Sequence, residues 1–292
     1  MNNTTTKRTF IIGEEWFFFK LYTGVKTADD ILIKHLAPLI NKWKQDRLIS
    51  KWFFIRYYDP DFHLRVRLQL NDTNHLQLII TDLKNCLSEL LSQKIIWKIQ
   101  IDTYVRELER YGFDTIDDAE TIFCIDSETI LSILNDLDET LDDNYRWLAG
   151  IYLTNKLLDT FKISLEDKKE LIEKYINAFK DEMGYNKFLK RQLDTKYRNT
   201  KKNIRGLLSN ETNYSFATSI KNHYHFPTSS INNILNNIQD KDILENIIFS
   251  LSHMTLNRLF RSKSRQNEFV IYYMLSHHYK SVIAQNKYNK VS

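Results

Sequence analysis

One stretch of the sequence, WFFIRYYDPDFHLRVRLQL at residues 52–70, constrains the fold more than any other. It predicts two β-strands joined by a turn at Asp59-Pro60-Asp61, because proline presets a turn dihedral and aspartate favours turns. Apolar and polar residues alternate in the second strand, and successive side chains of a strand point to opposite faces. We therefore expect a core face formed by Phe62, Leu64, Val66, Leu68 and Leu70, and an opposite face that presents His63, Arg65, Arg67 and Gln69.

Two arginines on one face of a strand have two explanations. They can lie on an exposed edge face, or they can lie inside the domain and face an anionic ligand. The hairpin is dense in aromatic residues, namely Trp52, Phe53, Phe54, Tyr57, Tyr58 and Phe62. This density favours a hairpin inside the domain, and our hypothesis is therefore an anion site at Arg65 and Arg67.

The rest of the chain predicts strands and two helices first, and then helices only. Residues 16–22 and 95–107 have β-type patterns, whereas residues 28–49, with Thr27 as a possible N-cap, and 74–93 have helical ones. Further helices are expected at residues 117–137, 144–161, 165–184, 215–237, 242–260 and 268–285.

This order of elements indicates the α+β class. We expect a small, mostly antiparallel sheet packed with helices in the N-terminal half and an all-helical C-terminal half. Because no linker-like composition interrupts the chain, we expect a single domain over residues 1–292, with residues 1–9 as a disordered lead.

Composition and motifs exclude several classes of protein. The net charge of +4 is mild and does not by itself indicate nucleic-acid binding. Cys86 and Cys124 lie among apolar residues outside any ligand spacing, which predicts free thiols in a reducing compartment. The sequence has no signal-peptide pattern and no apolar run of bilayer length, so we expect a soluble, cytoplasmic protein without a membrane partner. No motif supports a metal, a nucleotide cofactor or serine-hydrolase chemistry.

A second group of charged residues follows the strand expected at residues 95–107. Glu107 and Arg110 are three residues apart, which places them on one side of a helical turn that Gly112 can end. The simpler explanation is a local ion pair worth a few tenths of a kcal/mol. The functional alternative is that Glu107 orients the guanidinium of Arg110 towards a ligand.

A third group lies in the segment SLSHMTLNRLF. His253 and Asn257 are one helical turn apart, and Arg258 is next to Asn257. A single histidine on a helix is more often structural or solvent-facing than catalytic, yet imidazole is the natural acid or base near neutral pH. Together, the three groups suggest an anion site without a cofactor, suited to stabilising a negatively charged intermediate.

These segments resemble a known family. WFFIRYYDPDFHLRVRLQL, TYVRELERYG followed by AETIFCIDS, and SLSHMTLNRLF are similar to three hallmark segments of the C-terminal elimination domain of class I lantibiotic dehydratases, also called the thiopeptide-type bacteriocin biosynthesis domain. The early segment RTFIIGEEWFFFKLYTG also resembles the start of these domains, so the resemblance covers nearly the whole chain.

The resemblance implies a function and a set of residues. In this family a glutamylation domain esterifies Ser or Thr of a precursor peptide with glutamate from glutamyl-tRNA, and the elimination domain expels the glutamate. The motif positions imply Arg65, Arg67, Glu107, Arg110 and His253 as catalytic residues, and we add His63, Asn257 and Arg258 as substrate-binding candidates. The expected partners are the precursor peptide and a separate glutamylating subunit, with a homodimer possible and neither cofactor nor direct nucleic-acid contact.

Two alternatives stay open. The same fold serves pyridine synthases of thiopeptide pathways, which join two dehydroalanines and release the leader peptide. A non-catalytic scaffold that binds the leader peptide would tolerate loss of Arg65, Arg67 or His253, whereas an eliminase would not.

Overall fold

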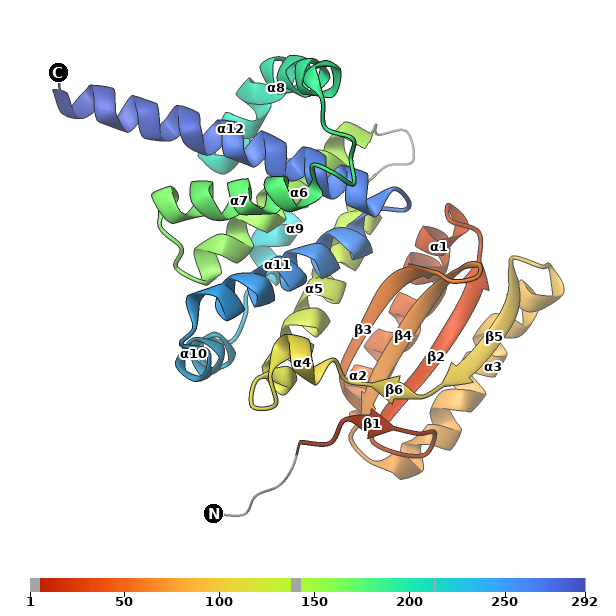
Figure 1. Ribbon diagram of the computed structural model, residues 1–292. Coiled ribbons are helices and arrows are strands. Elements are labelled where there is room, and N and C mark those ends of the chain that lie inside the picture. The colour runs from red at the N-terminus through yellow and green to blue at the C-terminus, as the bar shows by residue number, and fades with distance from the viewer. Residues whose placement is uncertain (1–5, 138–142, 213, 292) are drawn as a thin grey trace. The chain divides into compact units, whose positions relative to one another are not determined.

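The computed structural model describes residues 6–137, 143–212 and 214–291 (Figure 1). The chain forms two compact units. The sheet unit comprises Met1–Asn135 and His223–Ile238, and the helical unit comprises Asp136–Asn222 and Gln239–Ser292. The expectation that both act as a single domain stays a prediction.

A four-stranded antiparallel sheet with the strand order β3-β4-β2-β5 forms the centre of the sheet unit. Its strands are β2 (Trp16–Thr23), β3 (Ile49–Tyr58), β4 (Phe62–Leu70) and β5 (Ile96–Asp102). The predicted hairpin is therefore confirmed, and β4 is an interior strand between β2 and β3. A two-stranded sheet pairs β1 (Thr9–Phe10) with β6 (Tyr104–Val105).

Helices complete the sheet unit. They are α1 (Thr27–Asp30), a π-helical segment (Ile31–Leu36), α2 (Ala37–Gln45), a short 3-10 turn (Thr73–His75), α3 (Leu76–Ser92), α4 (Leu108–Tyr111), α5 (Ile116–Asp136) and α10 (Thr228–Asn237). In Figure 1, α2 and α3 lie behind the sheet. The apolar face of the sheet is buried over β2, β3 and β4, as the alternation in β4 predicts, whereas Ile99 and Ile101 on the edge strand β5 are partly exposed. The buried residues of this face include Phe17, Phe19, Leu21, Trp52, Phe54, Leu64, Val66 and Leu68.

The helical unit is a helix bundle, as expected for the C-terminal half. It contains α6 (Asp143–Thr160), α7 (Leu165–Phe179), α8 (Lys187–Leu208), α9 (Ser215–His223), α11 (Lys241–Leu259) and α12 (Ser264–Val291). Gly150 lets α6 approach α11 and α12 closely. A methyl group at Gly150 would lie 2.5 Å from Cδ1 of Ile271 and 3.1 Å from Cδ2 of Leu256.

Several element boundaries differ from the sequence prediction. The helix expected at 28–49 ends at Gln45, because Arg47 adopts a φ of 56° and the amide of Leu48 bonds the carbonyl of Trp43 at 2.8 Å. This is a Schellman ending, which usually carries glycine and was therefore not visible in the sequence. Thr27 does not cap the helix, since the N-cap position is Lys26.

The pairing of β1 with β6 contradicts two predictions, a continuous strand at residues 95–107 and a disordered lead at residues 1–9. The strand is broken at Thr103 into β5 and β6, because β6 leaves β2 and pairs with β1 instead. Thr9 therefore lies in a strand, and the carbonyl of Arg8 accepts a hydrogen bond from the amide of Arg106. Residues 1–5 of the predicted lead lie outside the described residues.

Three further helical regions differ from the sequence prediction. Helix α8 was not predicted, because most of its residues are charged or carry amides, although Leu189, Leu193, Ile204 and Leu207 lie on one side of it. The helix expected at 215–237 is divided into α9 and α10 around Pro227, and the helix expected at 268–285 runs from Ser264 to Val291.

Candidate functional site

The polar face of β4 carries His63, Arg65 and Arg67 in the middle of the sheet, and we name it the arginine face. His63, Arg65 and Arg67 pair in register with Tyr22, Lys20 and Phe18 on β2, and with Tyr57, Ile55 and Phe53 on β3. The prediction that the hairpin lies inside the domain therefore holds for β4, whereas β3 is an edge strand and Tyr58 at its end is exposed. Arg67 therefore has an aromatic cross-strand neighbour on both sides, whereas Arg65 lies between Lys20 and Ile55.

His63 is buried and holds Arg65. Its Nε2 accepts a hydrogen bond from Nε of Arg65 at 3.1 Å, and its Nδ1 lies 2.9 Å from the carbonyl oxygen of Asp61. Because arginine only donates, these contacts require the neutral tautomer with the proton on Nδ1. Burial lowers the pKa of His63, and the positive charge of Arg65 acts in the same direction. The geometry therefore makes His63 a support for Arg65.

Aromatic rings hold both guanidinium groups. The Cζ atom of Arg65 lies 3.5 Å from the ring centre of Tyr57. The Cζ atom of Arg67 lies 4.6 Å from Phe18, 5.2 Å from Phe53 and 4.9 Å from Tyr104. Rings attract a cation electrostatically and restrict its orientation without neutralising its charge.

The face around these arginines has an excess of positive charge. Lys20 pairs in register with Arg65 and forms an ion pair with Asp102, and this contact lowers the pKa of Asp102. Asp102 is the one acidic residue among the strand positions that share this face, all of which the structure describes. The arrangement can bind and stabilise an anion.

Glu107 and Arg110 form the local ion pair that the spacing predicts. Their Oε2 and Nη1 atoms lie 3.0 Å apart at the single turn of α4, which ends at Gly112 with a φ of 82°. The two side chains are 60% and 47% exposed. An ion pair this exposed adds little stability, and both side chains are accessible to a ligand.

A buried ion pair that the sequence analysis missed lies beside it. Arg106 bonds both carboxylate oxygens of Glu120, at 2.7 Å and 2.6 Å, and the hydroxyl of Tyr104 donates to the same carboxylate at 2.8 Å. Tyr104 also contacts Arg67. This network links β6 to α5 and connects the second hallmark segment to the arginine face. The motif TYVRELERYG contained the signal, but spacing alone did not show which arginine is buried.

His253 has a carboxylate partner. In the helical unit, its Nδ1 lies 2.8 Å from Oε2 of Glu268, which is 0% exposed, whereas the imidazole of His253 is 23% exposed. The hydroxyl of Tyr272 donates to the other oxygen of Glu268 at 2.8 Å. A carboxylate at Nδ1 fixes the imidazole and leaves Nε2 for proton transfer.

The environment of Glu268 is itself held in place. Nη1 of Arg265 lies 3.7 Å from Glu268, and Arg265 forms a two-bond ion pair with Glu182 at 3.2 and 2.6 Å. Sequence analysis missed Glu268, because it lies on a different helix from His253, beyond the turn between α11 and α12.

The remaining candidates on α11 differ in solvent exposure. Asn257 is half-buried, one turn after His253, whereas Arg258 is fully buried. The structure thus joins His63 to Arg65 and Glu107 to Arg110 within the sheet unit, and it describes His253, Asn257 and Arg258 in the helical unit. Their roles stay predictions.

Other features bear on cofactors and location. Among the described residues, no cluster of His, Cys, Asp and Glu could hold a metal ion. Cys86 and Cys124 are free thiols, and burial raises the pKa of Cys124 to about 11. Over the described part of the chain, the helices lack the length and apolar character needed to cross a bilayer.

Comparison with known proteins gives the family. The family model described as "Lantibiotic biosynthesis dehydratase C-term" matches residues 16–279. The chain belongs to this family.

Curated relatives are longer than this dehydratase-family chain. Nisin biosynthesis protein NisB of Lactococcus lactis subsp. lactis is 30% identical over 200 residues, which cover 60% of this chain and 20% of NisB. Subtilin biosynthesis protein SpaB of Bacillus subtilis is 27% identical over 256 residues, which cover 85% of this chain and 24% of SpaB. The chain thus spans about a fifth to a quarter of the length of these relatives.

Solved structures share the fold. The tRNA-dependent lantibiotic dehydratase MibB from Microbispora sp. 107891 matches with a TM-score of 0.74 and 18% identity, over 94% of this chain and 29% of MibB. The pyridine synthase TbtD from thiomuracin biosynthesis matches with a TM-score of 0.63 and 10% identity, over 92% of this chain and 99% of TbtD.

Proposed function

We propose that this chain eliminates glutamate from glutamylated Ser or Thr residues of a precursor peptide and leaves dehydroalanine or dehydrobutyrine. Membership of the lantibiotic dehydratase family supports the proposal, as does the presence of the motif residues Arg65, Arg67, Glu107, Arg110 and His253. The observation that carries it is the contact between His253 and the buried carboxylate of Glu268, because elimination requires a proton-transfer group.

The proposed reaction is balanced without an oxidant or a reductant. A base removes the α-proton of the esterified residue, the electron pair forms a double bond between the α- and β-carbons, and the β-carbon–oxygen bond to glutamate breaks. Glutamate leaves as a carboxylate, which needs no proton near neutral pH. The step that needs a protein group is therefore removal of the α-proton, and we assign it to Nε2 of His253.

The arginine face supplies the second requirement. Removal of the α-proton moves negative charge onto the adjacent peptide carbonyl oxygen, and a preorganised cation lowers the energy of that charge. Arg67 in its aromatic setting and Arg65 held by His63 are suited to this task.

The other candidates have supporting roles in this proposal. Arg110 binds a carboxylate of the glutamyl group, and Glu107 orients it, as their 3.0 Å contact allows. Asn257, half-buried and one turn from His253, contacts the peptide. Arg258 has no exposed surface and contributes to substrate binding only through its neighbours.

The proposed partners are the precursor peptide and a separate protein that glutamylates it, all in the cytoplasm. A homodimer is part of the same proposal, and light scattering of the purified chain tests it. The proposal involves no cofactor, because none of its steps transfers electrons to or from the substrate.

A second candidate function is pyridine synthesis. The similarity to TbtD favours it, since the match covers 99% of that chain. The higher identity to NisB and SpaB supports elimination instead.

Mass spectrometry separates these functions. A precursor peptide with a glutamylated Ser or Thr is incubated with the purified protein alone. We expect loss of glutamate and formation of a dehydro residue, whereas His253→Ala and Arg67→Ala should leave the adduct in place. His223→Ala, which changes an exposed histidine, is the matched control and should retain activity.

If wild-type protein leaves the adduct intact, the proposal fails. A peptide that carries two dehydroalanines is then the next substrate, and ring formation would identify a pyridine synthase. Inertness towards both peptides would support a binding scaffold.

A further inference from the structure

Helix α8 carries a stripe of positive charge. Its 22 residues include eight Lys or Arg and one acidic residue, Asp194. At about 100° per residue, seven of the basic residues fall within a sector of about 120° and extend over about 27 Å. All seven are exposed, and they define the basic stripe: Lys187, Lys190, Arg191, Arg198, Lys201, Lys202 and Arg205.

The basic stripe is costly to the helix and is not neutralised. Like charges one turn apart, such as Arg198 and Lys202 or Lys201 and Arg205, destabilise a helix by roughly 0.2–0.5 kcal/mol per pair. Among the described residues, no Asp or Glu forms an ion pair with a residue of the basic stripe. Because the whole chain has a net charge of only +4, this charge is concentrated on α8.

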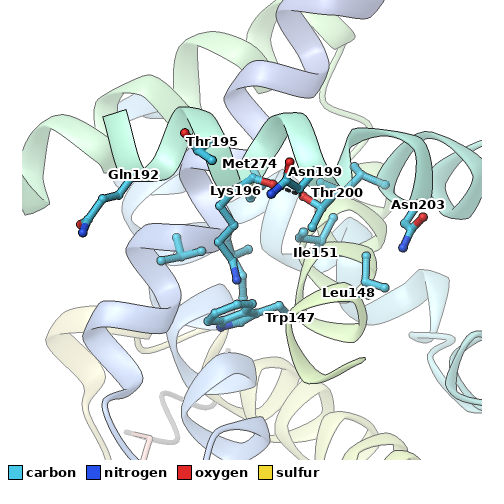
Figure 2. Close-up of a pocket in the computed structure, with 13 residues that line it drawn as sticks. Trp147, Leu148, Ile151, Gln192, Thr195, Lys196, Asn199, Thr200, Asn203 and Met274 are labelled. Carbon is cyan, nitrogen blue, oxygen red and sulfur yellow. Dashed lines mark hydrogen bonds between the residues drawn. The ribbon is translucent and has the colours of Figure 1, made fainter. Parts of the chain in front are cut away.

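A groove runs beside the basic stripe. Its volume is about 580 Å³, and α8 forms one wall with a row of amide and hydroxyl side chains, Gln192, Thr195, Asn199 and Asn203. Helices α6 and α12 form an aliphatic wall with Leu148, Ile151, Val270 and Met274. Figure 2 shows both walls, with Lys196 reaching from α8 to the ring of Trp147.

The two features define the chemistry of an occupant. A segment bound in the groove would pack apolar side chains against α6 and α12. Its polar groups would form hydrogen bonds with the amide and hydroxyl side chains of α8, and its outer side would face the basic stripe. This is the pattern of an amphipathic helix in a hydrophobic groove, with acidic residues along one flank. Of the described residues that line the groove, Trp147 is the one aromatic residue, and Lys196 covers its ring. This disfavours RNA, because single-stranded nucleic acid is bound by bases stacking on free aromatic faces.

We propose that this groove binds an acidic, amphipathic segment of the precursor peptide that lies outside the reacting residues. The inference rests on the proposed function, because that function makes the substrate a peptide. Binding here would hold the peptide while its glutamylated residues react elsewhere on the protein.

Fluorescence anisotropy of the full chain tests the binding directly. The probe is a labelled 18-residue synthetic peptide with leucines on one helical face and glutamates on the other, without Ser or Thr. A scrambled peptide of the same composition and an 18-nucleotide oligouridylate are the comparison probes. We expect at least tenfold tighter binding of the amphipathic peptide than of the scrambled one, and weaker binding as salt rises.

Three variants locate the site. Lys201→Glu with Lys202→Glu should weaken peptide binding at least tenfold, and Asn199→Trp should do so by filling the groove. Lys241→Glu with Lys287→Glu makes the same charge change at exposed positions outside the groove and should leave binding within twofold. Circular dichroism verifies that each variant is folded.

Equal binding of both peptides, preferential binding of the oligouridylate, or no binding overturns the inference. Since the probes contain no Ser or Thr, these outcomes do not depend on elimination. In the elimination assay, Lys201→Glu with Lys202→Glu should raise KM with unchanged kcat, and an unchanged KM would exclude the precursor as the occupant.

Discussion

Glu268→Gln is the change that most directly tests the role of His253. The carboxylate of Glu268 is completely buried and contacts Nδ1 of His253 at 2.8 Å. When His253 takes a proton at Nε2, Glu268 faces an imidazolium, and the hydrogen bond between them becomes charge-assisted. Glutamine keeps the size of the side chain but removes its negative charge.

The expected effect follows from the strength of this contact. A hydrogen bond to a charged group contributes roughly 1.5–3 kcal/mol, and each 1.36 kcal/mol corresponds to about a tenfold change in rate. We therefore expect kcat to fall by about 10- to 150-fold. KM should stay within about twofold, since Glu268 has no surface that a substrate can reach.

The assay is single-turnover elimination from a glutamylated peptide, followed by mass spectrometry at several peptide concentrations. Tyr272→Phe is the matched comparison, because it removes the hydroxyl that contacts Ser252 and the other oxygen of Glu268 but keeps the negative charge of Glu268, and it should cost less than about tenfold. The reasoning is refuted if folded Glu268→Gln retains the wild-type kcat, or if the substitution changes KM alone.

Three further predictions concern the rest of the chain. Glu120→Gln removes the buried charge partner of Arg106 and leaves only the exposed Asp117, so it should lower the free energy of unfolding by about 3 kcal/mol in urea titrations, and an unchanged midpoint would contradict this. Burial lowers the pKa of His278 to about 4, so its neutral form stabilises the fold above pH 6.5 and this contribution is lost as the pH falls towards 4. Because His278 is part-exposed, wild type should lose only about 1 kcal/mol more than His278→Gln between pH 7 and pH 5, measured by urea unfolding at each pH. Arg67→Lys keeps the charge but loses the planar stacking on three rings, so elimination should slow by about tenfold or more at unchanged stability, and full activity would show that charge alone suffices.

The sequence by itself determined the features that depend on local periodicity. Strict alternation in residues 62–70 assigned Leu64 and Val66 to the core and Arg65 and Arg67 to the opposite face, because the side-chain period of a strand is two. The contact between Glu107 and Arg110 was likewise predictable, since three residues in a helical turn bring side chains together.

Local rules failed where a distant segment decided the outcome. The strand at 95–107 breaks because β1, about ninety residues earlier, pairs with β6. Helix α8 was missed for a different reason: its apolar residues lie on one helical face, but ten mostly polar residues separate Leu193 from Ile204.

Only the tertiary structure decided which charges are buried and which partners they have. Arg106 and Arg110 lie in the same motif, yet Glu120 on α5 buries the first, while the second stays half-exposed. Glu268 meets His253 because α11 and α12 pack side by side, and no spacing within one helix encodes that contact. Burial and charge pairing between elements are properties of the packed chain, whereas a sequence pattern specifies only the neighbours within each element.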